Sequence, residues 1–288
     1  MVFVSLSQMG YIRTCMIPLR DYRPSGIVPY VSYGLLALNV LVFLYQLLLE
    51  GRASDVYGGV LRLANGEQIL VFSDQLRRGF GLLSQNEVFV NTYGMVPCKL
   101  FGGCPAYSFA GSLVQTVLQT SSAAWQTLFT SMFMHGSLFH LGSNMLYLWI
   151  FADNVEASFG HWKFLGFYLL CGLAAAFAQA LMDTHSPIPM IGASGAISGV
   201  LGAYLFMFPH ARVLTLVPII FFIQFIRLPA LIVLGIWFAG QVLSALLSSG
   251  AGGGVAVMAH IGGFVAGAVL YRFLRRAQPV ASQPFPDL

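Results

Sequence analysis

Charged residues are scarce in this chain: of its 288 residues, only 8% are charged and 57% are hydrophobic. A soluble domain typically carries about 25% charged residues. A chain this poor in charge cannot cover a water-facing surface, so the composition predicts a protein whose solvent is largely the lipid bilayer. The net charge of +4 is small, and we expect no nucleic-acid partner.

Two further absences narrow the chemistry. Four cysteines are too few for a disulfide scaffold. The sequence contains no CxxC pair and no HExxH motif, so we expect no metal and no other cofactor. The first fifteen residues have no basic start and only weak apolar character, and we therefore expect no cleavable signal peptide.

Long uncharged runs are the main feature that is present. A membrane-spanning helix needs about 20 apolar residues, and such runs form helices because lipid offers the backbone no hydrogen-bonding partner. We therefore expect an all-α membrane protein with six transmembrane helices. The predicted spans are 27–49, 137–152 and somewhat beyond, 164–182, 189–208, 228–248 and 254–271. The apolar stretch 213–226 is only 14 residues long, and we expect it to lie at the interface without spanning.

The distribution of cations predicts the orientation of these spans. If the N-terminus is cytoplasmic, the short outer loops carry no lysine or arginine, in keeping with the positive-inside rule. Both termini are then cytoplasmic. We expect an N-terminal tail at 1–26, a six-helix core at 27–275 and a C-terminal tail at 276–288. The cations on the inner side would be Arg13, Arg20, Arg23, Lys163, Arg212, Arg227, Arg272, Arg275 and Arg276.

One outer loop, at about 50–136, is much longer than the other connections. A loop of this length is expected to be functional or partly folded. Asn65-Gly66 between two β-prone runs predicts a hairpin, and 112–130 has the pattern of an amphipathic helix. Cys98 and Cys104 in this loop either close a small ring in an oxidising compartment or remain free thiols, and the sequence favours neither.

Ser194 and His260 lie on two apolar segments that are unusually rich in glycine. A serine in a membrane helix is most often a small packing residue. However, glycines flank both Ser194 and His260, and two glycine-lined faces can approach each other closely. Close approach would bring the Ser194 hydroxyl within reach of the His260 ring, and a serine needs such a base to become a nucleophile. The flanking glycines are Gly192, Gly195, Gly199 and Gly202 on one segment and Gly262, Gly263 and Gly267 on the other.

The stretch HGSLFHLGSN carries a second group of polar residues. His140 and Asn144 are four residues apart, so they share one helix face. Both can donate hydrogen bonds, and paired donors aimed at one point are what a developing oxyanion requires. The alternative is that the two form a hydrogen-bonded clamp between helices. His161, His185 and His210 fall in connections, and we expect them to be ordinary surface residues.

Together, GASGAISG, AHIGGFVAG and HGSLFHLGSN resemble the rhomboid family of intramembrane serine proteases. The resemblance extends from Met16 to about Arg275 and leaves out 51 to about 86. It implies an endopeptidase of the bacterial plasma membrane that cleaves transmembrane segments of single-pass or multi-pass membrane proteins near the outer side of the bilayer.

The resemblance also implies roles for individual residues. Ser194 matches the nucleophile and His260 the general base of a dyad. His140 and Asn144, with the Ser194 amide, match the oxyanion-stabilising groups. Structural positions near the site are His135, Gly192, Gly195, Gly199 and Gly263, and Glu156 matches a structural position at the inner end of the second span.

The sequence departs from the family pattern at two places. The family often has Trp-Arg in the first loop, whereas this chain has Trp125-Gln126. Some members place an aromatic ring one turn after the nucleophile, against the base, and this chain has Ser198 there. The sequence therefore does not say what holds the His260 ring.

Two other function classes compete with the protease. One is a catalytically inactive rhomboid-like factor that binds membrane proteins, which the presence of both Ser194 and His260 disfavours. The other is a proton-coupled transporter with intramembrane histidines. The absence of carboxylates from five of the six predicted spans argues against a transporter.

Overall fold

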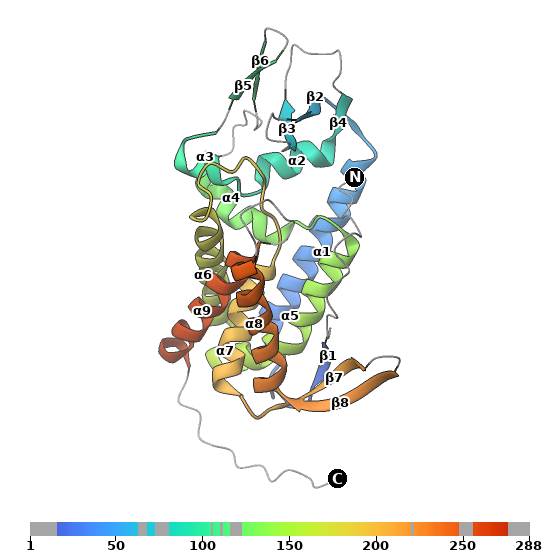
Figure 1. Ribbon diagram of the computed structural model, residues 1–288. Helices are drawn as coiled ribbons and strands as arrows, with labels where there is room; N and C mark the ends of the chain where they lie inside the picture. Colours follow the sequence, from blue (N-terminus) through green and yellow to red (C-terminus); the bar gives the residue numbers. More distant parts are fainter. Residues whose placement is uncertain are drawn as a thin grey trace.

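The computed structural model describes residues 16–62, 68–72, 81–104, 106–109, 112–115, 123–219, 222–247 and 256–275. This part of the chain is mostly helical, with a small β-sheet at each end of a helical bundle (Figure 1). The helices of the bundle are α1 (Tyr30–Glu50), α5 (Leu138–Phe159), α6 (His161–Ala180), α7 (Ser194–Met207), α8 (Ala230–Leu247) and α9 (Val257–Leu274).

Each predicted span overlaps one of these helices, although their bounds differ from those expected. Four of the described helices, α1, α6, α8 and α9, are long and apolar enough to cross a membrane. Helix α7 is apolar but has only 14 residues, because it begins at Ser194, after Gly192 with φ +132°. That backbone conformation favours glycine and is incompatible with a right-handed helix. Helix α5 carries Asp153 and Glu156 near its C-terminal end.

The expectation of an all-α protein is wrong in the long loop. A five-stranded sheet of order β4-β2-β3-β6-β5 forms there. The predicted helix at 112–130 is also wrong in its first part, because 112–115 pair with another strand; among the described residues of this stretch, 124–130 are helical. Strand pairing outside the bundle overrides a weak helical pattern. The strands are β2 (Ala53–Arg62), β3 (Gln68–Phe72), β4 (Gly81–Ser84), β5 (Ala106–Phe109) and β6 (Ser112–Gln115).

Short helices lie between this sheet and the bundle (Figure 1). They are α2 (Gln85–Tyr93), α3 (Pro97–Phe101), α4 (Ala124–Thr130) and the 3₁₀ turn η2 (Ser131–Phe133). Strand β2 pairs antiparallel with β3, as the predicted hairpin requires, while the Asn65-Gly66 turn itself lies outside the described residues. In α3 and the turn after it, Cys98 and Cys104 are joined by a disulfide.

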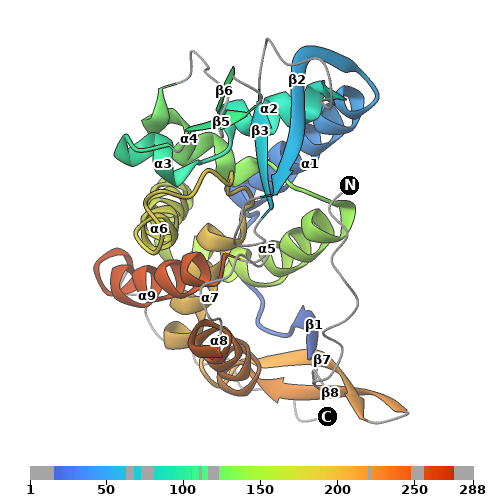
Figure 2. The same cartoon turned by 45° about the horizontal axis from the view of Figure 1, so that its top comes forward.

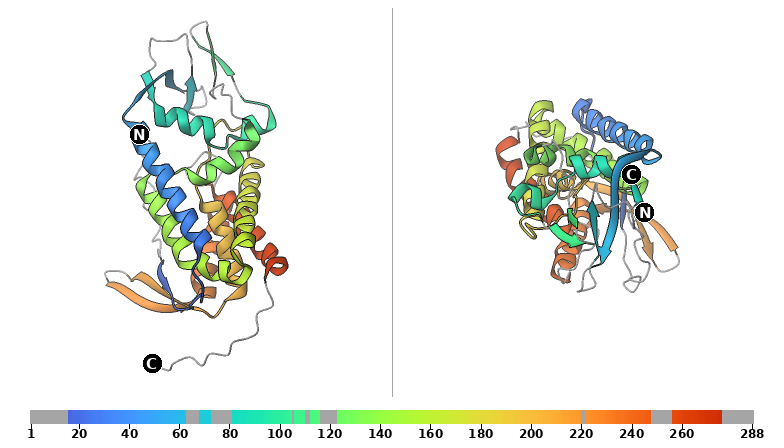
Figure 3. Two further views of the ribbon diagram at one scale, coloured as in Figure 1. Left: turned by 180° about the vertical axis from the view of Figure 1, so that it is seen from behind. Right: turned by 90° about the horizontal axis from the view of Figure 1, so that it is seen from above.

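The second sheet occupies the opposite end of the bundle and also departs from the all-α expectation. Its strands are β1 (Ile17–Asp21), β7 (Arg212–Ile219) and β8 (Phe222–Pro229), in the order β1-β7-β8, with both pairs antiparallel. The described residues of the apolar stretch 213–226 therefore belong to a β-hairpin. Figure 3 shows this hairpin extending sideways from the base of the bundle, across the direction of α1.

Helix α7 is the central element of the bundle and packs against α5, α6, α8 and α9 (Figure 2). Its contact with α9 depends on glycine. A β-carbon at Gly263 would collide with the carbonyl oxygen of Gly195, and one at Gly267 with that of Gly199. The two backbones approach this closely because neither face carries side chains at the crossing. The largest buried side chains around α7 include Phe151, Phe164, Phe167, Tyr168, Leu201 and Tyr204.

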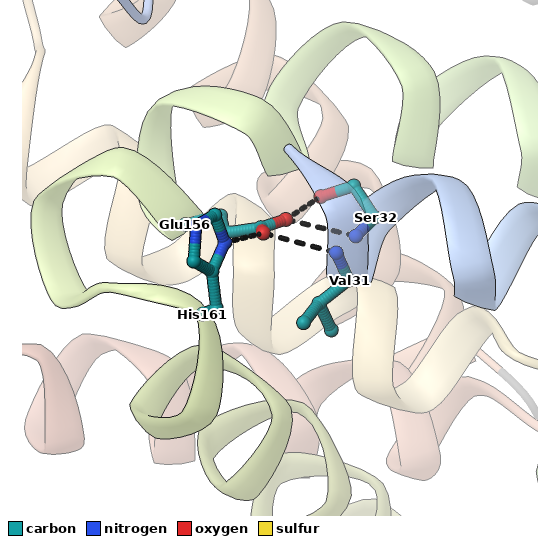
Figure 4. A network of polar contacts seen from close by, with 4 residues as sticks. All are labelled: Val31, Ser32, Glu156 and His161. Carbon is teal, nitrogen blue, oxygen red and sulfur yellow. Dashed lines mark hydrogen bonds and ion pairs between the residues drawn. The ribbon is translucent and has the colours of Figure 1, made fainter. Parts of the chain in front are cut away.

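A buried carboxylate, Glu156, near the C-terminal end of α5, contacts the starts of α1 and α6 and so joins three helices (Figure 4). It accepts hydrogen bonds from the amides of Val31 and Ser32, at 3.0 and 2.8 Å, and from the Ser32 hydroxyl, at 2.6 Å. Nδ1 of His161, the first residue of α6, contacts the same carboxylate. An anion at a helix N-terminus satisfies unpaired amides and the helix dipole. Glu156 thus fixes the start of α1 against α5 and α6, and His161 has more than the surface role expected.

A second carboxylate, Asp21, attaches β1 to the bundle. The Tyr204 hydroxyl and Nδ2 of Asn154 both donate to its Oδ2, the latter at 2.9 Å, and the Arg23 amide donates to Oδ1 at 2.9 Å. Burial raises the pKa of Asp21 to about 6, against the lowering effect of the Tyr204 and Arg23 hydrogen bonds. The folded protein therefore holds this proton more tightly than the unfolded chain does.

We expect Asp21 to make stability depend on pH. Its contribution is complete below about pH 4, near the ordinary value of 3.8, and is lost as the pH rises through about 6. The loss amounts to roughly 2–3 kcal/mol at most. Asp21→Asn, which keeps an acceptor, should lack this dependence. The test is the melting temperature of the wild type and of Asp21→Asn in detergent between pH 4 and 8. If the melting temperature of both proteins changes with pH in the same way, the prediction is contradicted.

Candidate active site

Ser194 is the first residue of α7 and lies at the end of the bundle near the long loop. The segment before it is fixed: the amide of Gly192 donates to the carbonyl of Ser131 at 2.9 Å, and Ala193 is buried. The first amides of a helix have no intrahelical partner and carry partial positive charge. Ser194 therefore combines a partly exposed hydroxyl with an amide suited to an anion.

The His260 ring contacts the Ser194 hydroxyl directly. Nε2 of His260 lies 2.9 Å from Oγ of Ser194, a distance at which the hydroxyl donates to the ring nitrogen. The two residues come from different helices, and the glycine crossing of α7 and α9 places them together. Both are only partly exposed. The structure thus brings together the two residues that the sequence singled out.

The other side of the His260 ring is held by a residue that the sequence analysis missed. Oε1 of Gln241, on α8, lies 2.8 Å from Nδ1 of His260. An amide oxygen only accepts, so Nδ1 carries the hydrogen and Nε2 is left with a lone pair toward Ser194. The Trp237 ring, one turn earlier on α8, lies 5.9 Å from the imidazole. A lone glutamine in an apolar span was the signal available.

The structure gives each residue that departs from the family pattern a hydrogen bond of its own. Ser198, where some members have an aromatic ring, donates back to the carbonyl of Ser194 at 2.6 Å and is buried. Gln126, in place of arginine, accepts from the amide of Ala123 at 3.3 Å at the start of α4. An arginine side chain has no hydrogen-bond acceptor and could not accept from this amide.

The start of α9 is held by another glutamine. Oε1 of Gln179, on α6, accepts from the amides of Met258 and Ala259 at 3.1 and 3.2 Å. These are among the amides that a helix N-terminus leaves unpaired. Because His260 follows directly, this contact fixes the height of its backbone relative to α6.

His140 and Asn144 lie on the first turns of α5, which Ser137 caps by accepting from the His140 amide at 3.1 Å. A β-carbon at Gly192 would stand 2.9 Å from Nε2 of His140 and 3.8 Å from Oγ of Ser194. The space above Gly192 is therefore bordered by both side chains. Nδ2 of Asn144 is buried and has no hydrogen-bond partner among the described residues. An unpaired buried donor is rare and calls for a partner.

His135 is fully buried beneath this pair, outside the helix α5. Its amide donates to Oε1 of Gln46 at 3.0 Å, and neither ring nitrogen has a partner among the described residues. Burial, and to a smaller extent His140, lowers the pKa of His135 to about 4. The ring is thus neutral at pH 7 and packs edge-on against His140, with centroids 5.0 Å apart.

A small cavity of about 30 Å³ adjoins Ser194. Its lining comes from η2, α6, the segment before α7, α7 itself and the start of α9, and its side chains are mostly small. They include Met132, Gly172, Ala175, Ala176, Gly195 and Ala259. A space of this size holds about one water molecule or a methyl group.

Comparison with known proteins identifies the family. Residues 122–277 match the Rhomboid domain, which is more than half of the chain. The chain therefore belongs to the rhomboid family, and the resemblance seen in the sequence is confirmed. It is an integral membrane protein.

Several characterised relatives match parts of the chain. Over 148 residues it is 38% identical to the rhomboid protease GluP of Bacillus subtilis, covering 51% of this chain and 26% of GluP. It is 35% identical over 91 residues to the mitochondrial rhomboid protein 1 of Saccharomyces cerevisiae, covering 30% of this chain and 26% of that protein. It is 30% identical over 187 residues to RHOMBOID-like protein 5 of Arabidopsis thaliana, covering 64% of this chain and 53% of that protein. The matched stretch is thus about a quarter to a half of each relative.

Proposed function

We propose that the chain is a serine endopeptidase that cleaves transmembrane segments of membrane proteins within the bilayer. The observation that carries this proposal is the Ser194 hydroxyl at 2.9 Å from Nε2 of His260, with the other ring nitrogen on Gln241. A nucleophile, its base and a group that orients the base are the parts of an activated serine. The name of one relative, GluP, identifies it as a protease.

The proposed reaction follows from the positions of these groups. Oγ of Ser194 attacks the scissile carbonyl carbon while its proton passes to Nε2 of His260. The negative charge on the carbonyl oxygen is stabilised by the Ser194 amide, by Nδ2 of Asn144 and by His140. The protonated His260 then gives its proton to the leaving amine, which breaks the C–N bond. Water, deprotonated by His260, hydrolyses the acyl-enzyme and restores Ser194.

The proposed membrane arrangement has six spans, with α5 and α7 added to the four helices that are long and apolar enough. Both tails, 1–26 and 276–288, would be cytoplasmic, with the core at 27–275 and the loop at about 50–136 outside. Helix α7 is about 21 Å long at 1.5 Å per residue, in a hydrocarbon core of about 30 Å. If its end lies at the inner surface, Ser194 lies roughly 10 Å below the outer one, within reach of outer water.

We propose a bacterial plasma membrane as the location, as the resemblance seen in the sequence implies; relatives named as mitochondrial conflict with this part of the expectation. The yeast relative is named as mitochondrial, so the domain also occurs in relatives of that organelle. The proposed mechanism depends on the depth and sidedness of Ser194, and it is the same in either membrane.

The small cavity beside Ser194 supports a preference for a small side chain before the scissile bond. A substrate helix must also unwind there, since its carbonyls are otherwise hydrogen-bonded, so residues of poor helix propensity should help.

Cleavage of a single-span substrate in liposomes tests the proposal. We expect one cut near the outer end of the span when alanine or glycine precedes the bond, and at least a tenfold lower rate with leucine or tryptophan there. Met132→Ala, which enlarges the cavity, should reduce that penalty. Absence of any cut across a panel of such spans, by a folded protein, would contradict the proposed function.

Gln241 should affect turnover more than substrate binding. Gln241→Met keeps the length of the side chain and removes the acceptor for Nδ1 of His260. Loss of one such hydrogen bond, worth about 0.5–1.5 kcal/mol, should lower kcat roughly three- to tenfold and leave KM nearly unchanged. Gln241→Glu, which keeps an acceptor, should retain more activity than the methionine variant. Equal kcat in Gln241→Met and the wild type would show that the contact does not orient the base.

A further inference from the structure

The hairpin of β7 and β8 exposes apolar side chains on both of its faces. Phe222, Ile223 and Phe225, here called the apolar end, are 72%, 63% and 63% exposed. Successive residues of a strand point to opposite faces, so Ile223 and Phe225 share one face and Phe222 lies on the other. Strand β1 pairs with β7 from Val213 to Leu216, so it ends at the row of Phe225 and does not reach Phe222 or Ile223.

Such an element is unfavourable in water. An exposed apolar edge strand invites pairing with other chains, and soluble proteins usually blunt such edges with charge, proline or a covering element. Here β8 is the edge strand of its sheet within the described residues, and its apolar end carries no charge. In an integral membrane protein the available apolar medium is the acyl region of the bilayer.

An arginine follows the apolar end on the face of Ile223 and Phe225. Arg227 is two residues from Phe225 and four from Ile223, which is about 7 Å and about 13–14 Å along a strand. Arg227 pairs with Leu214, and Leu214 pairs with Arg20, so the two arginines flank Leu214 in one row across the sheet. Both guanidinium groups lie over the Tyr22 ring, at 5.5 Å for Arg20 and 4.7 Å for Arg227.

These arginines have no carboxylate partner among the described residues. The nearest acid on β1, Asp21, faces the bundle and is occupied by Tyr204 and Asn154. The ion pair found in the described part of the chain is that of His161 with Glu156. The exposed face of the second sheet is therefore cationic next to the bundle and apolar at its far end. Exposed apolar side chains together with unpaired cations on one element are typical of a segment that lies in the interface of a leaflet containing anionic lipid.

We propose that the β7–β8 hairpin is an interfacial anchor: its apolar end enters the acyl region of the leaflet at that end of the bundle, and Arg20 and Arg227 bind the phosphates of anionic phospholipids. The hairpin extends sideways from the bundle (Figures 1 and 3), so it contacts lipids beyond those around the helices. This surface lies at the opposite end of α7 from Ser194 and does not depend on the proposed protease activity.

The position of the apolar end is tested with a spin label in liposomes of phosphatidylcholine and phosphatidylglycerol. The label is placed by Phe225→Cys in protein whose Cys15 and Cys171 are alanine. We expect it to be accessible to oxygen and shielded from a water-soluble nickel reagent, like a label at Leu243, which is 56% exposed on α8. A label at exposed Asp183 is the water-facing control.

Two results would overturn this position. If the label at 225 is as accessible to nickel as the label at Asp183, the hairpin lies in water. If it shows dipolar broadening from a second label at high lipid-to-protein ratio, the apolar end is an interface between copies of the chain.

The headgroup contact has its own test. A fluorophore at position 225 is quenched with brominated phosphatidylglycerol or brominated phosphatidylcholine. The ratio of the two quenching efficiencies gives the relative affinity of the hairpin for the two lipids. We expect a several-fold preference for phosphatidylglycerol that Arg20→Gln with Arg227→Gln abolishes or nearly abolishes. Arg20→Lys with Arg227→Lys, which conserves charge, should keep most of it. An unchanged ratio in the glutamine variant would refute the role of the arginines.

Discussion

Ser194→Ala and His260→Ala should each reduce cleavage of a transmembrane substrate by about 10⁴-fold or more, because loss of the proposed nucleophile or of its proposed base removes the covalent route. The hydroxyl of Ser194 has Nε2 of His260 as its hydrogen-bond partner at 2.9 Å. The measurement is the initial rate of cleavage in liposomes at equal protein concentrations.

The control for this prediction is folding. Both substitutions remove atoms from partly exposed positions at the ends of α7 and α9 and leave the glycine crossing intact, so melting temperatures should change little. Ser198→Ala is the matched serine variant: it lies on the same helix and loses a bond to the Ser194 carbonyl, but it should keep most activity. Retention of wild-type rates by either dyad variant would remove Ser194 or His260 from the mechanism.

Asn144→Ala should lower kcat by about 10²–10³-fold, or about 2.7–4 kcal/mol, the usual cost of losing one oxyanion donor. Its Nδ2 is buried without a partner among the described residues, as expected of a donor whose acceptor, the substrate oxyanion, forms only during the reaction. The loss should fall mainly on kcat, since the donor acts on the transition state. His140→Ala should behave similarly, and the double variant should lose less than the product of the two if both serve one oxygen.

Asn154 offers a matched control on the same helix. It is also buried, but its Nδ2 donates to Asp21 and to the carbonyl of Arg23 at the far end of α5. Asn154→Ala should lower the melting temperature and leave kcat near the wild-type value. If Asn144→Ala showed that same pattern, Asn144 would be a clamp between helices and not an oxyanion donor.

The parts of the site that the sequence predicted are those with a repeated local signal. Glycines recur beside Ser194 and His260, and the structure places these two glycine faces in backbone contact. Four-residue spacing likewise placed His140 and Asn144 on one face. Each inference required only helix periodicity and the close packing that glycine permits.

The parts that the sequence did not predict depend on contacts between distant segments. Gln241 is a lone amide in an apolar run, and its role depends on where α8 meets α9. His161 contacts Glu156, whose other partners, Val31 and Ser32, lie about 125 residues earlier. A continuous apolar stretch such as 213–226 has no periodicity that separates strand from helix. Its pairing with β1 decides the outcome, and β1 is some 190 residues away in the sequence.

The most direct test of the central claim is reaction with a fluorophosphonate probe, followed by mapping of the labelled peptide. The proposed dyad predicts a label on Ser194 of the wild-type protein, none in Ser194→Ala, almost none in His260→Ala, and a slower reaction in Asn144→Ala. Absence of label from folded wild-type protein, or equal labelling of His260→Ala, would contradict the dyad and favour a catalytically inactive rhomboid-like factor that binds membrane proteins.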